Sequence, residues 1–297
     1  MWKHALFAPA LLCSALSPAP AFAEAPTAQS PAAAQMDHIS VQVMGSGDPV
    51  ILIPGLSSPR AVWDGVASHL AAGHRVYLVQ VNGFAGGDPK GNLQPGILDG
   101  IVADLDQYIA AQKLNRPAIV GHSMGGLAAL MLAKAHPDRV GKLMIVDSLP
   151  FIGSIFMPGA TVETLQPMAA QMRDRMKDTP TSEAAAKQLA ATMAVSPQAR
   201  EKVAGWVMAS DPRVSAQAMY EDMTTDLRPD MATIATPITL VYPTSEAMPA
   251  TSADPFYRAQ YADAPSVTYV AVADSGHFVM LDQPAAFETA IDAFLSK

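Results

Sequence analysis

The sequence predicts an α/β protein with a mostly parallel central sheet, flanked by helices and interrupted by an inserted helical cap. Short runs rich in aliphatic and β-branched residues alternate with helical patterns, which is typical of strand–helix–strand units. One of these runs ends in Gly121-His122-Ser123-Met124-Gly125 and leads directly into a helical pattern. Between Asp147 and about Thr236 the alternation stops, because the pattern there is helical without a clear strand.

Seven runs are predicted as strands because they are short, apolar and bounded by turn-forming residues. They are residues 38–44, 50–54, 76–81, 118–121, 143–146, 238–242 and 267–272. Helical patterns fill four of the gaps, at 60–72, 97–112, 124–135 and 285–295. We place the helical cap insertion at about 150–232, within the single large domain that residues 36–297 are long enough to form.

The first 23 residues match an export signal. A basic start at Lys3 and His4 precedes the apolar stretch 5–16, and Ala21-Phe22-Ala23 provides an A-x-A cleavage site. The apolar stretch is too short to span a bilayer as a helix. We therefore expect cleavage near Ala23, a periplasmic or secreted protein, and no stable membrane anchor.

Composition limits the possible partners and cofactors. Residues 24–35 are rich in Ala, Pro and Ser and are expected to form a flexible lead-in. Cys13, the only cysteine, lies in the signal, so the mature chain has no thiol chemistry or disulfide. No Cys/His cluster has metal-ligand spacing, and we predict neither a metal nor an organic cofactor. With a formal net charge of −8 and no basic run, nucleic acid is an unsuitable partner.

The segment Gly121-His122-Ser123-Met124-Gly125-Gly126 resembles the nucleophile elbow of the α/β-hydrolase family. In such a strand-to-helix turn, small residues allow the backbone to bend sharply and expose the serine hydroxyl. The amide of Met124, at the start of the following helix, then points to where negative charge would develop. The resemblance therefore implies that Ser123 is a catalytic nucleophile.

A serine nucleophile needs a base, and His277 is the best-placed histidine. It follows the last predicted strand at its carboxyl end, where open α/β sheets assemble their sites. The segment Gly276-His277-Phe278, with Asp282 and Pro284, also resembles the catalytic-histidine loop of the family.

Two carboxylates compete to orient the histidine. The family often has an aspartate four residues past the end of the strand predicted at 238–242, where this chain has Glu246. The alternative is Asp147, at the end of the strand predicted at 143–146 and at a site that some family members use. We prefer Glu246, and either residue preserves the order Ser, acid, His.

The resemblance also implies an oxyanion hole and a substrate pocket. The turn after the strand predicted at 50–54 supplies the backbone N–H of Leu56, which joins that of Met124. The helical insertion carries nine of the 17 methionines, and adaptable thioether side chains suit an apolar ligand. The residues that we expect to line the pocket are Phe151, Phe156, Met157 and Trp206.

Together these features predict an exported serine hydrolase that cleaves carboxylic esters through an acyl-enzyme on Ser123. The partner would be a small-molecule ester with an apolar acyl or alcohol part. Two alternatives remain. The same triad could act on a lactone, thioester, amide or carbon–carbon bond, or the fold could serve only binding with a decayed triad. The sequence indicates neither the oligomeric state nor the substrate.

Overall fold

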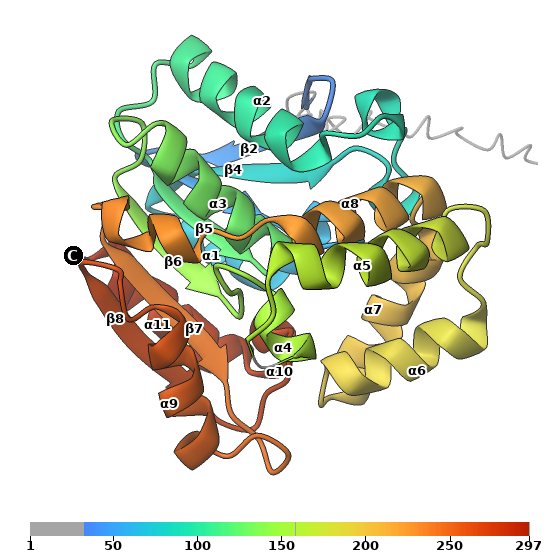
Figure 1. Ribbon diagram of the computed structural model, residues 1–297. Helices are drawn as coiled ribbons and strands as arrows, with labels where there is room; N and C mark the ends of the chain where they lie inside the picture. Colours follow the sequence, from blue (N-terminus) through green and yellow to red (C-terminus); the bar gives the residue numbers. More distant parts are fainter. Residues whose placement is uncertain (1–32, 158, 297) are drawn as a thin grey trace, which may run out of the picture. The chain divides into compact units, whose positions relative to one another are not determined.

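The computed structural model describes residues 33–157 and 159–296 (Figure 1). The predicted export signal and most of the predicted lead-in lie outside these residues. The end of the lead-in is described, and it differs from the expectation: Ala34–Gln35 form a short strand, β1, that pairs antiparallel with β2. Among the described helices, none has both the length and the apolar character needed to cross a bilayer.

A central eight-stranded sheet has the order β1-β2-β4-β3-β5-β6-β7-β8. β2 pairs antiparallel with β1 and with β4, and every pair from β4 to β8 along this order is parallel. The mostly parallel sheet predicted from the sequence is therefore confirmed, and the seven predicted runs are all strands. Their bounds are β2 Ile39–Gly45, β3 Asp48–Ile53, β4 His74–Val81, β5 Ala118–His122, β6 Lys142–Val146, β7 Ile238–Pro243 and β8 Val267–Val272.

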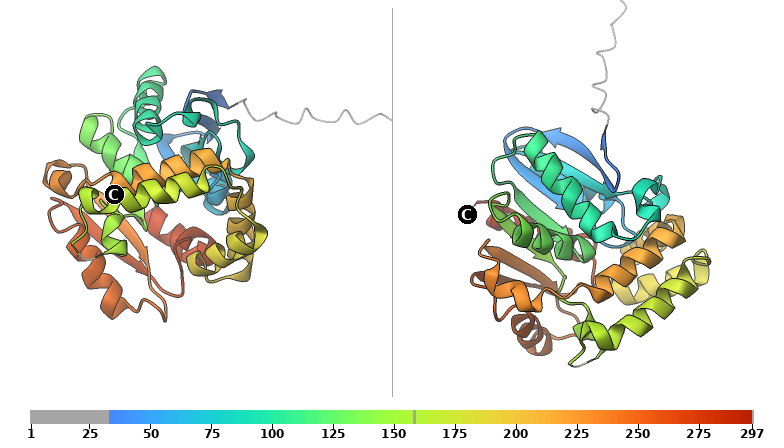
Figure 2. Two further views of the ribbon diagram at one scale, coloured as in Figure 1. Left: turned by 45° about the vertical axis from the view of Figure 1, so that its right-hand side comes forward. Right: turned by 45° about the horizontal axis from the view of Figure 1, so that its top comes forward.

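Helices cover both faces of the sheet (Figures 1 and 2). Residues of α2 (Ile97–Ala111), α3 (Met124–Ala135) and α9 (Ala250–Gln260) share one core cluster with one face. The other face packs against α1 (Asp64–Leu70) and α11 (Pro284–Leu295). Successive residues of β3 alternate between the two cores, because side chains of a strand point to opposite faces. A parallel sheet buried on both faces explains why its strands read as continuous apolar runs.

Several short elements were not predicted. The helix expected at 60–72 is a 3₁₀ turn, η1 (Arg60–Trp63), followed by α1. Two more 3₁₀ turns, η2 (Phe84–Gly86) and η3 (Lys90–Leu93), connect β4 to α2. The helices α9 and α10 (Val279–Asp282) also lie in stretches where no helix was predicted.

The segment between β6 and β7, which we call the helical insertion, contains five helices and no strand among its described residues. In Figure 1, α5 and α8 run side by side, and α6 and α7, which pack on each other, lie below them. The bounds are α4 Gly153–Phe156, α5 Val162–Met176, α6 Glu183–Met193, α7 Pro197–Ala209 and α8 Pro212–Thr224, followed by the 3₁₀ turn η4 Arg228–Thr233. Serine, threonine or aspartate side chains cap the amino ends of the four longer helices, which explains where these helices begin.

The junction between β5 and α3 depends on close backbone contact, and this can be tested with Gly121→Ala. A Cβ at Gly121 would lie 2.3 Å from the carbonyl oxygen of Gly125, so the turn would have to shift. We expect a loss of about 1–3 kcal/mol in the free energy of unfolding, measured by urea denaturation. Gly65→Ala in α1 is the matched control, because a Cβ there meets nothing within 4 Å. That substitution should stabilise by up to about 1 kcal/mol; similar stability changes in both variants would contradict the close-packing argument.

Candidate active site

Ser123 occupies a strained turn between β5 and α3. Its backbone angles, φ 53° and ψ −126°, are unusual for a residue with a side chain. Two backbone hydrogen bonds hold it: its N–H donates to the Val146 carbonyl at 3.0 Å, and its carbonyl accepts from the Gly126 N–H at 2.7 Å. Gly125 packs so closely on the chain after β3 that a Cβ would lie 2.5 Å from the Ile53 and Pro54 carbonyls. The predicted elbow at Ser123 is therefore present as a fixed, strained turn.

The carboxylate that contacts His277 is Asp147. His277 Nδ1 and Asp147 Oδ2 are 2.7 Å apart, and both side chains are largely buried. Asp147 directly follows β6, where it adopts a φ of 44° and its N–H donates to the Val241 carbonyl at 2.8 Å. The backbone of two neighbouring strands thus positions this carboxylate against the imidazole.

The preference for Glu246 was wrong. Its side chain is exposed, and it forms no hydrogen bond or ion pair with any described residue. The reason is the turn after β7, which is closed by a hydrogen bond from Ser245 N–H to the Met248 carbonyl at 2.9 Å. Glu246 lies at the corner of this turn and faces solvent, whereas Asp147, the weighed alternative, ends the neighbouring strand.

A tyrosine that sequence reasoning missed holds the other oxygen of Asp147. The Tyr257 hydroxyl, on α9, donates a hydrogen bond to Asp147 Oδ1. Burial, together with the negative charge of Asp147, raises the pKa of Tyr257 far above its ordinary value, so the hydroxyl remains a donor. Nearby, the Tyr261 hydroxyl donates to the Ser148 carbonyl at 2.8 Å. No sequence signal indicated Tyr257, because α9 itself was not predicted.

His122 supports the loop that carries His277. Its Nε2–H donates to the His277 carbonyl oxygen at 2.9 Å, and the two ring centroids are 4.5 Å apart. Burial first, and then the positive charge of His277, lower the pKa of His122 well below its ordinary value, so it remains neutral. Because His122 directly precedes Ser123, this contact brings the imidazole of His277 beside the elbow. His122 thus links the nucleophile turn to the loop that carries His277.

The turn after β3 lies next to the start of α3, as expected for a pair of oxyanion donors. The Ser58 N–H donates to the Gly55 carbonyl at 3.2 Å and closes this turn. Neither the Leu56 nor the Met124 N–H donates a hydrogen bond to any described residue, so both are free for a ligand. The helical insertion also holds this turn, since Ser57 Oγ lies 2.8 Å from Ser215 Oγ of α8.

The four residues predicted to line the pocket have different surroundings. Phe151 is fully buried in a small cluster within the insertion, and the Arg228 guanidinium lies over its ring. Phe156 and Met157 are 46% and 45% exposed, so they do not line an enclosed pocket. Only Trp206 lies near the site, through its contact with Phe278, whose ring also packs on both His122 and His277. Phe151 is enclosed by its own cluster and cannot contact a ligand, whereas the roles of Phe156, Met157 and Trp206 remain predictions.

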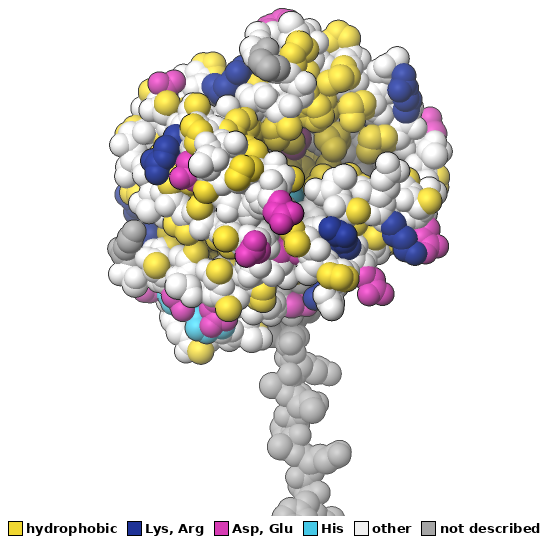
Figure 3. All heavy atoms as spheres, turned by 90° about the horizontal axis from the view of Figure 1, so that it is seen from below, with side chains coloured by type: hydrophobic (Ala, Val, Ile, Leu, Met, Phe, Trp, Pro, Cys, Tyr) yellow, Lys and Arg dark blue, Asp and Glu magenta, His cyan; other side chains and the backbone are white. Residues whose placement is uncertain are grey.

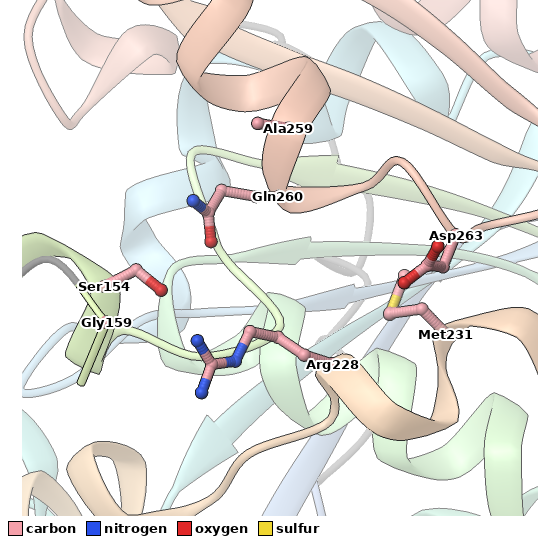
Figure 4. Close-up of a pocket in the computed structure, with 7 residues that line it drawn as sticks. All are labelled: Ser154, Gly159, Arg228, Met231, Ala259, Gln260 and Asp263. Atoms are coloured by element: carbon pink, nitrogen blue, oxygen red, sulfur yellow. The ribbon is translucent and has the colours of Figure 1, made fainter. Parts of the chain in front are cut away.

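Two other surface features are separate from these residues. A pocket of about 280 Å³ is lined by polar and apolar groups, among them Ser154, Arg228 and Gln260, and contains none of the predicted catalytic residues (Figure 4). On the exterior, His69, Glu288 and Asp292 could offer three metal-ligand atoms within 4.8 Å of one another. They pair as ordinary exposed ion pairs. The face shown in Figure 3 is hollowed, and hydrophobic side chains line one side of the hollow.

The chain is similar to known hydrolases. Residues 50–290 match the model of a family described as "Alpha/beta hydrolase family". A pimeloyl-[acyl-carrier protein] methyl ester esterase of Edwardsiella ictaluri is 30% identical over 195 residues, which are 63% of this chain and 71% of that esterase. A thermophilic esterase structure from Thermogutta terrifontis superposes with a TM-score of 0.71 at 20% identity, covering 87% of this chain and 93% of that one. The enol-lactonase structure from Burkholderia xenovorans LB400 gives 0.70 at 18%, covering 87% and 96%.

The hydrogen bond from Tyr257 to Asp147 can be tested with Tyr257→Phe. The change removes the donor and leaves a buried carboxylate oxygen unpaired, so we expect a loss of about 1–3 kcal/mol in the free energy of unfolding. Tyr220→Phe is the control, because its hydroxyl makes only an exposed contact with Gln166 at 3.2 Å. The control should change stability by no more than about 0.5 kcal/mol. If the two variants lose equal stability, Tyr257 is not an anchor of Asp147.

Proposed function

Because the chain belongs to the alpha/beta hydrolase family, we propose that it is an exported serine hydrolase that cleaves carboxylic esters. The observation that carries this proposal is the hydrogen bond between His277 and Asp147, held beside the strained turn of Ser123. A histidine fixed by a carboxylate and placed beside a partly accessible serine is the arrangement that acyl transfer requires.

In the proposed reaction, Ser123 Oγ attacks the ester carbonyl carbon while His277 Nε2 accepts the hydroxyl proton. Asp147 holds the imidazole in the correct tautomer and stabilises its protonated form. The Leu56 and Met124 amides would stabilise the negatively charged oxygen of the tetrahedral intermediate. His277 then gives its proton to the leaving alcohol, and the acyl group remains on Ser123. A water molecule, deprotonated by His277, releases the acid and restores the serine.

Several observations support an ester with an apolar part. The named relative from Edwardsiella ictaluri is a methyl ester esterase. In this chain, the ring of Phe278 packs on His277, and the partly exposed ring of Trp206 packs on Phe278, so Trp206 would offer an apolar surface to a substrate. The proposal of export depends on the leader pattern alone, a basic start followed by an apolar stretch and an A-x-A site before Glu24.

The nucleophile is tested with Ser123→Ala and a short-chain nitrophenyl ester. We expect the wild-type protein to hydrolyse the ester and to be labelled covalently by a fluorophosphonate, because both reactions need the same activated hydroxyl. Ser123→Ala should lower kcat by about 10⁴-fold or more and abolish labelling. Turnover of lactones or thioesters alone would retain the nucleophile but change the substrate class. Absence of both turnover and labelling in the wild-type protein would refute the enzyme proposal.

The acid is tested by comparing Asp147→Asn with Glu246→Gln. The first change preserves shape but favours the wrong tautomer of His277, so we expect kcat to fall by about 10³–10⁴-fold. Glu246 is exposed and does not contact His277, so its variant should retain kcat to within about twofold. Steady-state kinetics on one ester gives both values, and the reverse ranking would return Glu246 to the triad.

A further inference from the structure

Asp222 of α8 is a buried carboxyl group without a hydrogen-bond partner among the described residues. Its side chain is 4% exposed. Other buried aspartates are paired: Asp104 Oδ2 accepts from the His38 N–H at 2.8 Å, and Asp147 accepts from Tyr257 and His277. Among the described residues, only Trp63 Nε1 and His122 Nδ1 are fully enclosed polar atoms without a partner. The Asp222 oxygens therefore keep a small accessible surface.

The position of Asp222 on α8 directs it toward the catalytic residues. It follows Ser215 by seven residues, close to two full helical turns, so the two side chains lie on one face of the helix. Ser215 Oγ lies 2.8 Å from Ser57 Oγ, in the turn that carries the Leu56 amide. The other faces of α8 are occupied, since Glu221 accepts hydrogen bonds from the Gly96 and Leu98 amides and Tyr220 contacts Gln166 of α5.

The pKa of Asp222 is consistent with a position near His277. Burial raises the pKa of Asp222 to about 7, and the charge of His277 is the opposing influence. This carboxyl is influenced by the charge of His277, yet it is bonded to neither the imidazole nor a cation among the described residues, so it is available to a donor group of a substrate.

We propose that Asp222 is a specificity-determining residue that binds a hydrogen-bond donor, a hydroxyl or an ammonium group, on the ester substrate. This inference rests on the proposed function, because it assigns a partner within the same site. A buried carboxyl without a partner destabilises the protein, and a substrate donor would satisfy it. A purely apolar substrate would leave it unpaired, so the site should reject such an ester relative to one that carries the donor.

The test compares kcat/KM for matched pairs of ethyl esters that differ only in the end of the acyl chain. Each pair replaces a terminal methyl group by a hydroxyl or an ammonium group, over a series of chain lengths. We expect the wild-type protein to favour the donor-bearing ester by about 10- to 100-fold for at least one length. Asp222→Leu should abolish this preference. Met219→Leu, a change on the same face of α8 that alters no charge, should retain it.

The outcomes separate this inference from the proposed function. If wild type hydrolyses both members of every pair equally, or if Asp222→Leu keeps the preference, the role of Asp222 is refuted and the esterase proposal stands. Absence of hydrolysis of every ester refutes the proposed function, and the inference with it. Asp222→Asn distinguishes the two donors, because a neutral amide still accepts from a hydroxyl but no longer neutralises an ammonium group.

A second measurement, which needs no turnover, follows the unfolding temperature with pH. The folded protein holds the Asp222 proton up to about pH 7, whereas the unfolded chain releases it near its ordinary pKa of about 3.9. As pH rises between these values the unfolded state binds fewer protons, so wild type loses stability. Asp222→Asn lacks this loss, and its advantage in unfolding temperature should grow from about pH 4 to about pH 7 and then level off. A variant that is less stable than wild type at pH 7 would show that Asp222 is already paired.

Discussion

The site depends on parallel strands that end at the same edge of the sheet. Ser123 follows β5, Asp147 follows β6, and His277 lies in the loop after β8. β5 and β6 are neighbours in the sheet, and β7 separates β6 from β8. Residues that are up to 154 positions apart in the sequence are thereby brought to one place without any of them needing a long loop. The sheet therefore brings Ser123, Asp147 and His277 close together, and local contacts orient their side chains.

Each catalytic candidate is held by a contact with a neighbouring part of the fold. Ser123 is fixed by its own backbone hydrogen bonds, Asp147 by Tyr257, and the His277 loop by His122. The histidine loop is further attached to the helical insertion, because Asp282 accepts hydrogen bonds from Gly276 and from Val195 and Ser196. These supports restrict the motion of the reacting groups, which is what positions a nucleophile and base for acyl transfer.

The sequence was sufficient to predict those parts of the molecule whose structure depends on the local pattern of residues. All seven expected strands formed, since a buried parallel strand has a short apolar run that turns interrupt. The nucleophile elbow could also be predicted from the sequence, because Gly121 and Gly125 are needed where two backbone segments come into close contact. The sequence could not decide whether Glu246 or Asp147 contacts His277. The answer depends on the direction of the turn after β7, which leaves Glu246 exposed to solvent. The burial of Phe151 could not be predicted for a similar reason, because it depends on the cluster that Ala160 and Leu165 form around it.

The helical insertion contributes polar groups to the turn after β3 that the sheet cannot provide. Ser215 and Ser210 both bond to Ser57, so α8 and the end of α7 help to fix the turn that carries the Leu56 amide. The same face of α8 presents Asp222, at a cost in stability that its unpaired burial imposes. Destabilising buried polar groups are expected mainly at functional sites. Elsewhere in this fold, Asp104 and Asp147 are paired by hydrogen bonds. The proposed binding of a substrate donor would give this costly carboxyl on α8 a partner, as Tyr257 and His277 do for Asp147.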